Sequence, residues 1–136
     1  MNNKFFNLSM EKQNKILNSG FKTFSENIYS KASMNSISQE AQISKSLLFF
    51  YFKNKKELYF YLFKKACEII NMSKKEQKYS GNDFFDLIKQ EIRNRINLQK
   101  KFPYIYLFIY NFYFEENPEV KKEIDEIIIV DTRSRS

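Results

Sequence analysis

The sequence predicts an all-α fold, and three observations carry this prediction. Gly and Pro occur only twice each among the 136 residues, which argues against a sheet-rich fold with many tight turns. Apolar residues recur at helical spacing along most of the chain. Residues that favour helix N-termini stand in front of several of these apolar stripes. We therefore expect helices joined by short polar links.

The first expected helix begins after Ser9, which is a suitable N-cap. Two shorter helices are expected after Ser33 and after Ser44, separated by a turn of a few residues. The apolar positions of the three helices are Met10, Leu17, Phe21 and Phe24 in the first, Met34, Ile37 and Ala41 in the second, and Leu48 and Phe52 in the third.

The remaining helices are expected to be longer. Asn54 is a good N-cap for a long helix, and Glu57 stands near the capping-box position. Asp83 is expected to begin another helix with Leu and Ile residues along it. Pro103 suits the first turn of the next helix, and Pro118 precedes a last apolar segment.

These elements divide the chain into three parts. Residues 1–53 form a compact three-helix unit, and residues 54–130 form a long connecting helix with a second helical layer. Residues 131–136 have no apolar periodicity, so we expect a disordered tail or a cloning remnant. No stretch is long and apolar enough for a membrane span or a signal peptide, and the single cysteine, Cys67, suits a cytoplasmic protein.

Positive charge is concentrated near the N-terminus. Residues 1–56 contain nine Lys and three Glu, a balance of +6, whereas the rest of the chain is nearly neutral at +1. A localised basic surface is the electrostatic signature of a protein that binds a polyanion, although a solvated lysine-rich surface would have the same composition.

The short helix, turn and short helix follow the plan of a helix-turn-helix motif, whose second helix enters the major groove of DNA. In that geometry the apolar Leu48 and Phe52 face the core. Lys55 would place an ammonium on a phosphate at the start of the long helix. Short helices with basic and aromatic residues also occur in ordinary bundles, so the pattern alone leaves both interpretations open. The side chains that would face outward are Ser44, Lys45, Ser46 and Phe49.

The stretch SKSLLFFYFKNKKEL, from Ser44 to Leu58, is the most specific block. Together with the preceding residues from about Ile16, it resembles the DNA-binding domain of tetracycline-repressor (TetR) family regulators. The resemblance implies an all-helical dimeric repressor of double-stranded DNA, with a small-molecule effector pocket in its C-terminal domain. By position it implies that DNA is contacted by Ser33, Lys45, Ser46, Phe49, Phe50, Tyr51 and Lys55.

The chain departs from the family pattern at two turns and in its length. Gln42 and Ile28 stand where the family usually has glycine, and such turns often need a positive φ. Family members also continue for several more helices, whereas this chain stops near Val130. The resemblance therefore implies a shortened C-terminal domain, in which the surface that forms a homodimer is not identified.

The C-terminal half is rich in aromatic residues. Phe84, Phe108 and Phe112 are candidates for the wall of an effector pocket that takes an apolar or cationic molecule. The alternative is that these rings belong to an ordinary helical core. The sequence assigns no effector-binding residue by itself.

Catalysis is not expected. The chain has no His, one Cys and no Gly-rich phosphate loop, so we expect no cofactor, no metal site and no enzyme activity. The sequence thus predicts a DNA-binding transcriptional regulator, most simply a repressor released by an effector. The alternative is a helical protein-interaction module without sequence-specific DNA binding.

Overall fold

The computed structural model describes residues 1–76, 81 and 83–135. Within these residues every regular element is helical, which confirms the predicted all-α fold. The elements are the 3-10 helix η1 (Asn3–Asn7) and the α-helices α1 (Met10–Glu26), α2 (Met34–Ala41), α3 (Lys45–Tyr51), α4 (Lys55–Lys75), α5 (Phe84–Lys101), α6 (Ile105–Tyr113) and α7 (Pro118–Arg135).

The predicted N-caps are confirmed. In each case the side-chain oxygen of the cap accepts a hydrogen bond from the backbone N–H three residues further on, which satisfies one of the free donors of the first turn. Pro118 is the first residue of α7, whereas Pro103 lies before α6 rather than in its first turn. The confirmed caps are Ser9, Ser33, Ser44, Asn54 and Asp83.

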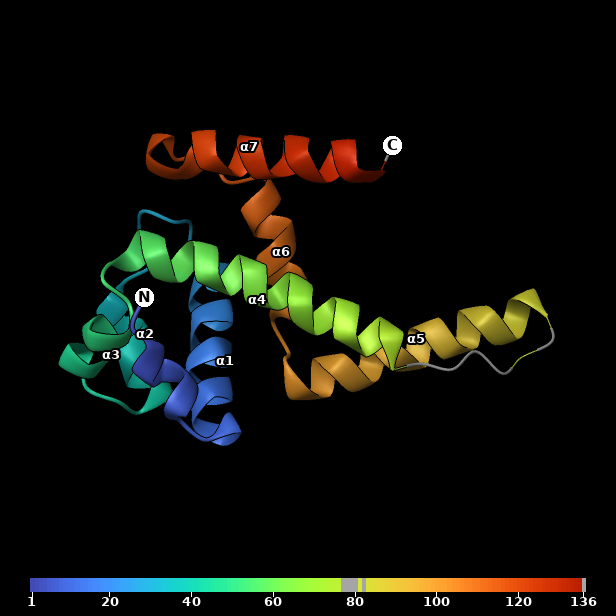
Figure 1. Cartoon of the computed structure of the whole chain (residues 1–136), viewed down its shortest axis with the longest axis horizontal. Helices are drawn as coiled ribbons and strands as arrows, with labels where there is room; N and C mark the ends of the chain where they lie inside the picture. The colour runs from blue at the N-terminus through green and yellow to red at the C-terminus, as the bar shows by residue number, and fades with distance from the viewer. Residues whose placement is uncertain (77–80, 82, 136) are drawn as a thin grey trace.

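Helices α1, α2 and α3 gather at one end of the molecule, with α1 against both α2 and α4 (Figure 1). Gly20 of α1 lies so close to α4 that a Cβ built on it would stand 2.5 Å from a methyl carbon of Leu62. The predicted apolar faces of the three helices are buried, except that Met10 is exposed. This core holds the helix-turn-helix as one unit.

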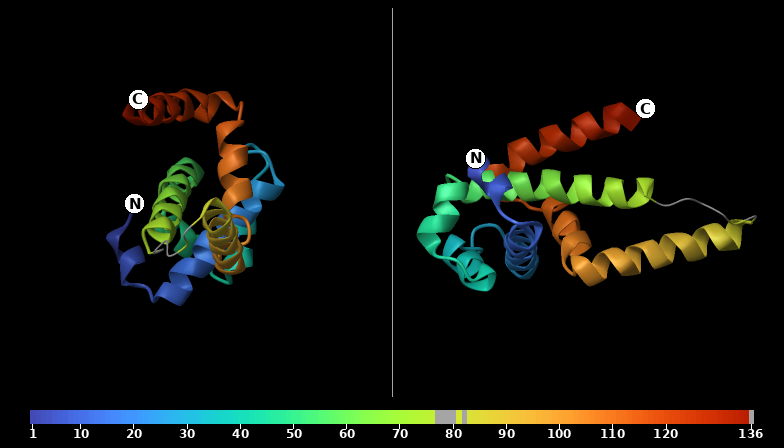
Figure 2. Two further views of the ribbon diagram at one scale, coloured as in Figure 1. Left: turned by 90° about the vertical axis from the view of Figure 1, so that its right-hand side faces the viewer. Right: turned by 60° about the horizontal axis from the view of Figure 1, so that its bottom comes forward.

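Helix α6 connects the two layers, because it packs against both α1 and α4 (Figure 1). Its rings Phe108 and Phe112 are fully buried, and Phe112 stacks on Phe63 of α4 with ring centroids 3.9 Å apart. Helix α5 runs beside the last turns of α4 and extends away from the N-terminal helices, and α7 lies on the opposite side of α4 (Figures 1 and 2). The apolar residues Ile92 and Ile96 of α5 are exposed.

The structure corrects two expectations about the ends of the chain. Helix α7 continues as far as Arg135, so residues 131–135 are helical rather than a disordered tail, and Ser136 lies outside the described residues. At the other end, η1 places Phe5 in the core, which the sequence analysis did not anticipate. Among the described residues, no helix combines the length and the apolar character that crossing a membrane requires.

Candidate nucleic-acid interface and the adjoining pocket

The turn between α2 and α3 is built on Gln42, which adopts the left-handed conformation with φ 60° and ψ 38°. Its backbone N–H donates to carbonyls of the last turn of α2, and the N–H of Ile43 donates to Ser38 O at 3.0 Å. The turn therefore keeps the positive φ that glycine would favour, although the residue is Gln. Ile28, the other expected glycine position, does not have a positive φ.

Helix α3 presents an apolar and basic face to solvent. Leu47, Phe49 and Phe50 are 36%, 40% and 47% exposed, while Leu48 between them is fully buried. Lys45 and Ser46 are also exposed, and the Lys45 ammonium lies 6.0 Å from the centroid of the Phe49 ring. A helix of seven residues thus exposes three large apolar side chains beside a lysine.

The N-terminal segment extends this face. The backbone N–H of Asn2 donates to Tyr51 O at 2.9 Å, and the Phe5 ring packs edge-on against Phe52 at 5.2 Å. These contacts place the Lys4 ammonium 5.6 Å from the centroid of the exposed Phe50 ring. Lys4 thus joins the surface of α3, and the sequence analysis missed it. The adjacent Phe5 and Phe6 are the sequence feature that could have indicated packing of this segment on the three-helix unit.

Ser33 and Ser44 are the N-caps of α2 and α3. Ser33 Oγ accepts from the N–H of Ser36 at 3.0 Å and donates to Ser36 Oγ at 2.9 Å. Ser44 Oγ accepts from the N–H of Leu47 at 3.0 Å. Both hydroxyls therefore order the first turns of α2 and α3, and contact with DNA by either serine stays a prediction.

Two expected DNA-facing residues have other positions. Tyr51 is only 6% exposed, because its ring packs between those of Phe5 and Phe50. The Lys55 ammonium turns inward and donates to the carbonyl oxygens of Tyr29 at 2.7 Å and Ala32 at 3.1 Å. In this structure Lys55 holds the loop before α2, which corrects the expectation that its ammonium is directed at a phosphate.

The other lysines of the N-terminal domain divide into paired and unpaired groups. Lys22 forms an ion pair with Glu40 at 2.9 Å, and this hydrogen bond and its charge raise the pKa of Lys22. Within the described part of the chain, Lys4, Lys45 and Lys53 pair with no carboxylate. Lys12 and Lys15 of α1 and Lys31 before α2 also form no ion pair among the described residues, so the lysines without a carboxylate partner lie on α1 and before α2 as well as around α3.

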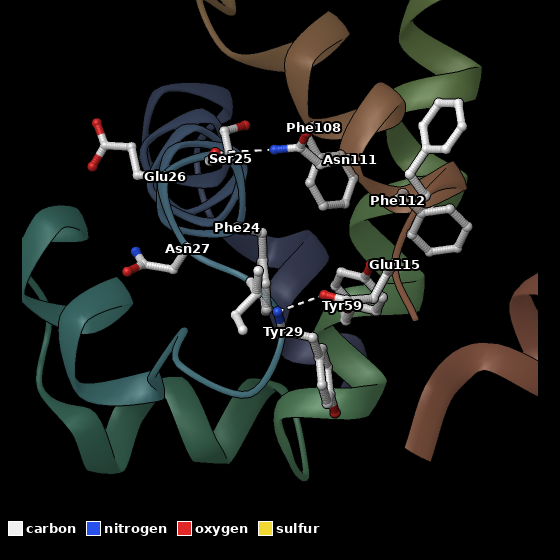
Figure 3. Close-up of a pocket in the computed structure, with 12 residues that line it drawn as sticks. Phe24, Ser25, Glu26, Asn27, Tyr29, Tyr59, Phe108, Asn111, Phe112 and Glu115 are labelled. Carbon is white, nitrogen blue, oxygen red and sulfur yellow. Dashed lines mark hydrogen bonds between the residues drawn. The ribbon is translucent and has the colours of Figure 1, made fainter. Parts of the chain in front are cut away.

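A cavity of about 260 Å³ lies where the end of α1 and the following loop meet α6 (Figure 3). Phe108 and Phe112, two of the expected pocket residues, line it. Phe84 does not: it is 69% exposed in the first turn of α5. The rings that line the cavity are Phe24, Tyr29, Tyr59, Phe108, Phe112 and Phe114.

Two hydrogen bonds cross the cavity and tie α6 and its end to the N-terminal domain (Figure 3). Asn111 Nδ2 donates to Ser25 O at 3.0 Å, and the backbone N–H of Tyr29 donates to Glu115 Oε1 at 2.6 Å. Burial, followed by the charges of nearby glutamates including Glu115, raises the pKa of Tyr29 to about 12. Burial likewise raises the pKa of Tyr59.

No group of three or more Cys, Asp or Glu side chains is arranged to hold a metal ion in the part of the chain that the structure describes. The geometry provides two kinds of surface: an exposed basic and aromatic face on α3, and an aromatic cavity behind the loop that leads into α2.

Comparison with known proteins agrees with the helix-turn-helix interpretation. Residues 16–62 match the family described as bacterial regulatory proteins, tetR family. The fold is similar to the crystal structure of a TetR family transcriptional regulator from Chloroflexus aurantiacus J-10-FL, with a TM-score of 0.66 and 25% sequence identity. The similarity covers 86% of this chain and 54% of the other, so this chain spans about half the length of that regulator. No match was found among curated proteins.

Proposed function

We propose that this chain, whose residues 16–62 match the tetR family of bacterial regulatory proteins, regulates transcription by binding double-stranded DNA through α3. Helix α3 would lie in the major groove, with the end of α2 and the N-terminal segment along the sugar–phosphate backbone. Such a protein acts in the bacterial cytoplasm.

The observation that carries this proposal is the composition of the exposed face of α3. Phe49 and Phe50 point away from the core next to the ammonium groups of Lys45 and Lys4. A lysine can donate to guanine or to a phosphate, and an aromatic ring can pack on a thymine methyl group. Ser46 adds a hydroxyl that can donate to a base or accept from one.

We further propose that the protein is a repressor that acts as a homodimer and is released by a small molecule. Two copies would place two α3 helices in successive major grooves, about 34 Å apart, and so read a two-fold symmetric operator. The aromatic cavity behind the loop before α2 supports control by a ligand, because it touches both the N-terminal domain and α6.

Fluorescence anisotropy tests this proposal. A labelled duplex from upstream of the protein's own gene and a scrambled duplex of the same composition are titrated at two salt concentrations. The proposal expects selective binding to the first duplex, and binding that weakens as salt rises because phosphate contacts release counterions. Absence of binding at low salt would favour the alternative, a helical protein-interaction module whose aromatic and basic surface meets a protein partner.

A further inference from the structure

We propose that two copies of this chain associate by packing α5 of each copy against α7 of the other. The inference rests on the proposed function, because it identifies the surfaces that join the homodimer. Three features support it: an apolar stripe with basic flanks on α5, an apolar face with acidic residues on α7, and the positions of the two helices in the fold.

Helix α5 exposes a stripe of large apolar side chains. Ile88, Ile92 and Ile96 follow one another at intervals of four residues and are 39%, 51% and 49% exposed. Residues at this spacing lie along one face of a helix, and contiguous exposed apolar patches mark interaction surfaces. Another face of α5 meets α4, where Asn94 Oδ1 accepts a hydrogen bond from Ser73 Oγ at 2.8 Å. The α5 stripe consists of Phe85, Ile88, Ile92 and Ile96.

Basic side chains flank the α5 stripe. Successive residues of a helix are rotated by about 100°, which places Lys89 and Arg93 on one side of the stripe and Arg95 on the other. Arg95 pairs with Glu91 at 3.6 Å, whereas Lys89 and Arg93 form no ion pair within the part of the chain that the structure describes. Helix α5 has five basic and two acidic residues, a balance of +3, so a negatively charged partner surface suits it.

Helix α7 has the complementary character. Residues 118–131 contain five acidic and two basic residues, a balance of −3. Val130 is 67% exposed, and Glu126 forms no ion pair among the described residues, whereas Glu123 pairs with Lys56 of α4. A shallow hollow, which we call the α7 face, is lined by residues at intervals of three and four and contains no Lys or Arg. Its lining residues are Glu123, Glu126, Ile127, Val130 and Asp131.

One copy cannot bring these two surfaces together, because α5 and α7 lie on opposite sides of α4 (Figures 1 and 2). A second copy can. A twofold axis that places α5 of one copy on α7 of the other creates the same contact twice. Each contact buries apolar side chains of both helices and joins the basic flanks of α5 to the acidic residues of α7.

The charges also select this arrangement over a contact of α5 with α5. Two α5 helices carry a charge of +3 each, and two α7 segments over residues 118–131 carry −3 each, so like pairs repel. The occupant of the α5 stripe is therefore α7 of a second copy.

Size-exclusion chromatography with light scattering measures the association of the full chain without DNA. We expect a mass near twice the 16.5 kDa of one chain. Ile92→Glu puts a carboxylate in the middle of the α5 stripe and should reduce the mass to that of one chain. The control is Ile28→Glu, which makes the same change at an exposed residue outside both helices and should leave the mass unchanged. A parent that stays at the mass of one chain, or equal effects of the two variants, would overturn the proposal.

Charge reversal tests which helices meet. Arg93→Glu and Glu126→Lys should each weaken self-association about two- to tenfold, and Lys12→Glu on α1 is the control for the charge change of Arg93→Glu. A mixture of the first two variants should associate more tightly than either variant alone, because the mixed dimer restores opposite charges across both contacts. If Arg93→Glu strengthens association, α5 meets α5 instead, and a mixture no tighter than the single variants contradicts the pairing of α5 with α7.

Anisotropy with the selected duplex separates this inference from the proposed function. The mass without DNA depends only on the contact between copies, and selective binding to a duplex with a single half-site depends only on the proposed function. Selective binding by a chain that stays monomeric would overturn the inference and leave the regulator function standing. Association that responds to the variants as expected, without binding of any duplex, would support the contact while the proposed function fails.

Discussion

The side-chain ammonium of Lys55 lies 2.7 Å from the backbone carbonyl oxygen of Tyr29 and 4.3 Å from the centroid of its ring. Lys55 is the first residue of α4, where the helix dipole disfavours a positive charge. The two carbonyls of the loop before α2 and the face of the Tyr29 ring supply the compensating interactions. The start of α4 thereby holds the loop that positions the helix-turn-helix.

Replacing Lys55 should therefore reduce the stability of the protein. Lys55→Ala leaves the carbonyls of Tyr29 and Ala32 without their donor, and we expect it to lower the free energy of unfolding by about 1–3 kcal/mol. Urea denaturation followed by circular dichroism measures this change. The control is Lys53→Ala, an exposed lysine nearby, for which a change within about 0.5 kcal/mol is expected. Equal effects of the two variants would show that the inward contacts contribute nothing.

Replacing Lys45 should instead affect DNA binding. Lys45→Ala removes an exposed ammonium from the first turn of α3 without removing any hydrogen bond within the protein that the structure describes. We expect weaker binding, by about 1–3 kcal/mol if Lys45 contacts a base, and an altered base preference. Anisotropy over a set of single-base duplex variants measures both. A uniform loss over all duplexes would place Lys45 on a phosphate, and an unchanged affinity would contradict the proposed orientation of α3.

The left-handed residue in the turn gives a prediction about backbone strain. Gln42→Gly should stabilise the protein by about 1 kcal/mol, because glycine adopts this conformation without a Cβ penalty. Gln42 also accepts an exposed hydrogen bond from Lys15 Nζ at 3.0 Å; both Gln42→Gly and Gln42→Ala remove this bond, and only the Ala variant keeps the Cβ. Thermal denaturation should therefore rank the Gly variant above the parent and the Ala variant. A Gly variant less stable than the parent would contradict the claim that the left-handed conformation of Gln42 costs stability.

The local chemistry of the fold could be predicted from the sequence. Ser33, Ser44 and Asn54 cap their helices because a cap depends on a few neighbouring residues, and the alternating burial of α3 follows from helical spacing. Gln42 was identified as a position of positive φ through the family resemblance, and Ile28, identified on the same ground, does not have a positive φ. The expected register of the helix-turn-helix was therefore accurate.

What could not be predicted depends on contacts between distant segments. The packing of Phe5 against Phe52 requires the N-terminal segment to return to α3, and no local pattern specifies that. The inward turn of Lys55 depends on where the carbonyls of Tyr29 lie. For the same reason Phe84 was grouped with Phe108 by composition, although the two residues belong to helices α5 and α6 and only Phe108 lines the cavity.

Tyr29 gives a prediction for alkaline pH. Its pKa in the folded protein is raised from 10.0 to about 12, chiefly by burial. A phenol whose pKa is higher in the folded than in the unfolded state stabilises the fold fully below pH 10, and this contribution is lost as pH rises toward 12. We expect the urea concentration at the unfolding midpoint of the parent to decrease as pH is raised from 10 to 12. The decrease should be smaller in Tyr29→Phe. An equal decline in both proteins would show that Tyr29 does not contribute.

The most direct test of the account is a selection of duplexes from a random-sequence pool by the parent protein and by Ser46→Ala, a variant of an exposed residue on α3. If α3 reads the major groove, the parent enriches a defined half-site, and the variant loses preference at one or two positions while keeping the rest. A pool that stays random with the parent, or identical sites from both proteins at every position, would contradict the claim that this face of α3 recognises DNA.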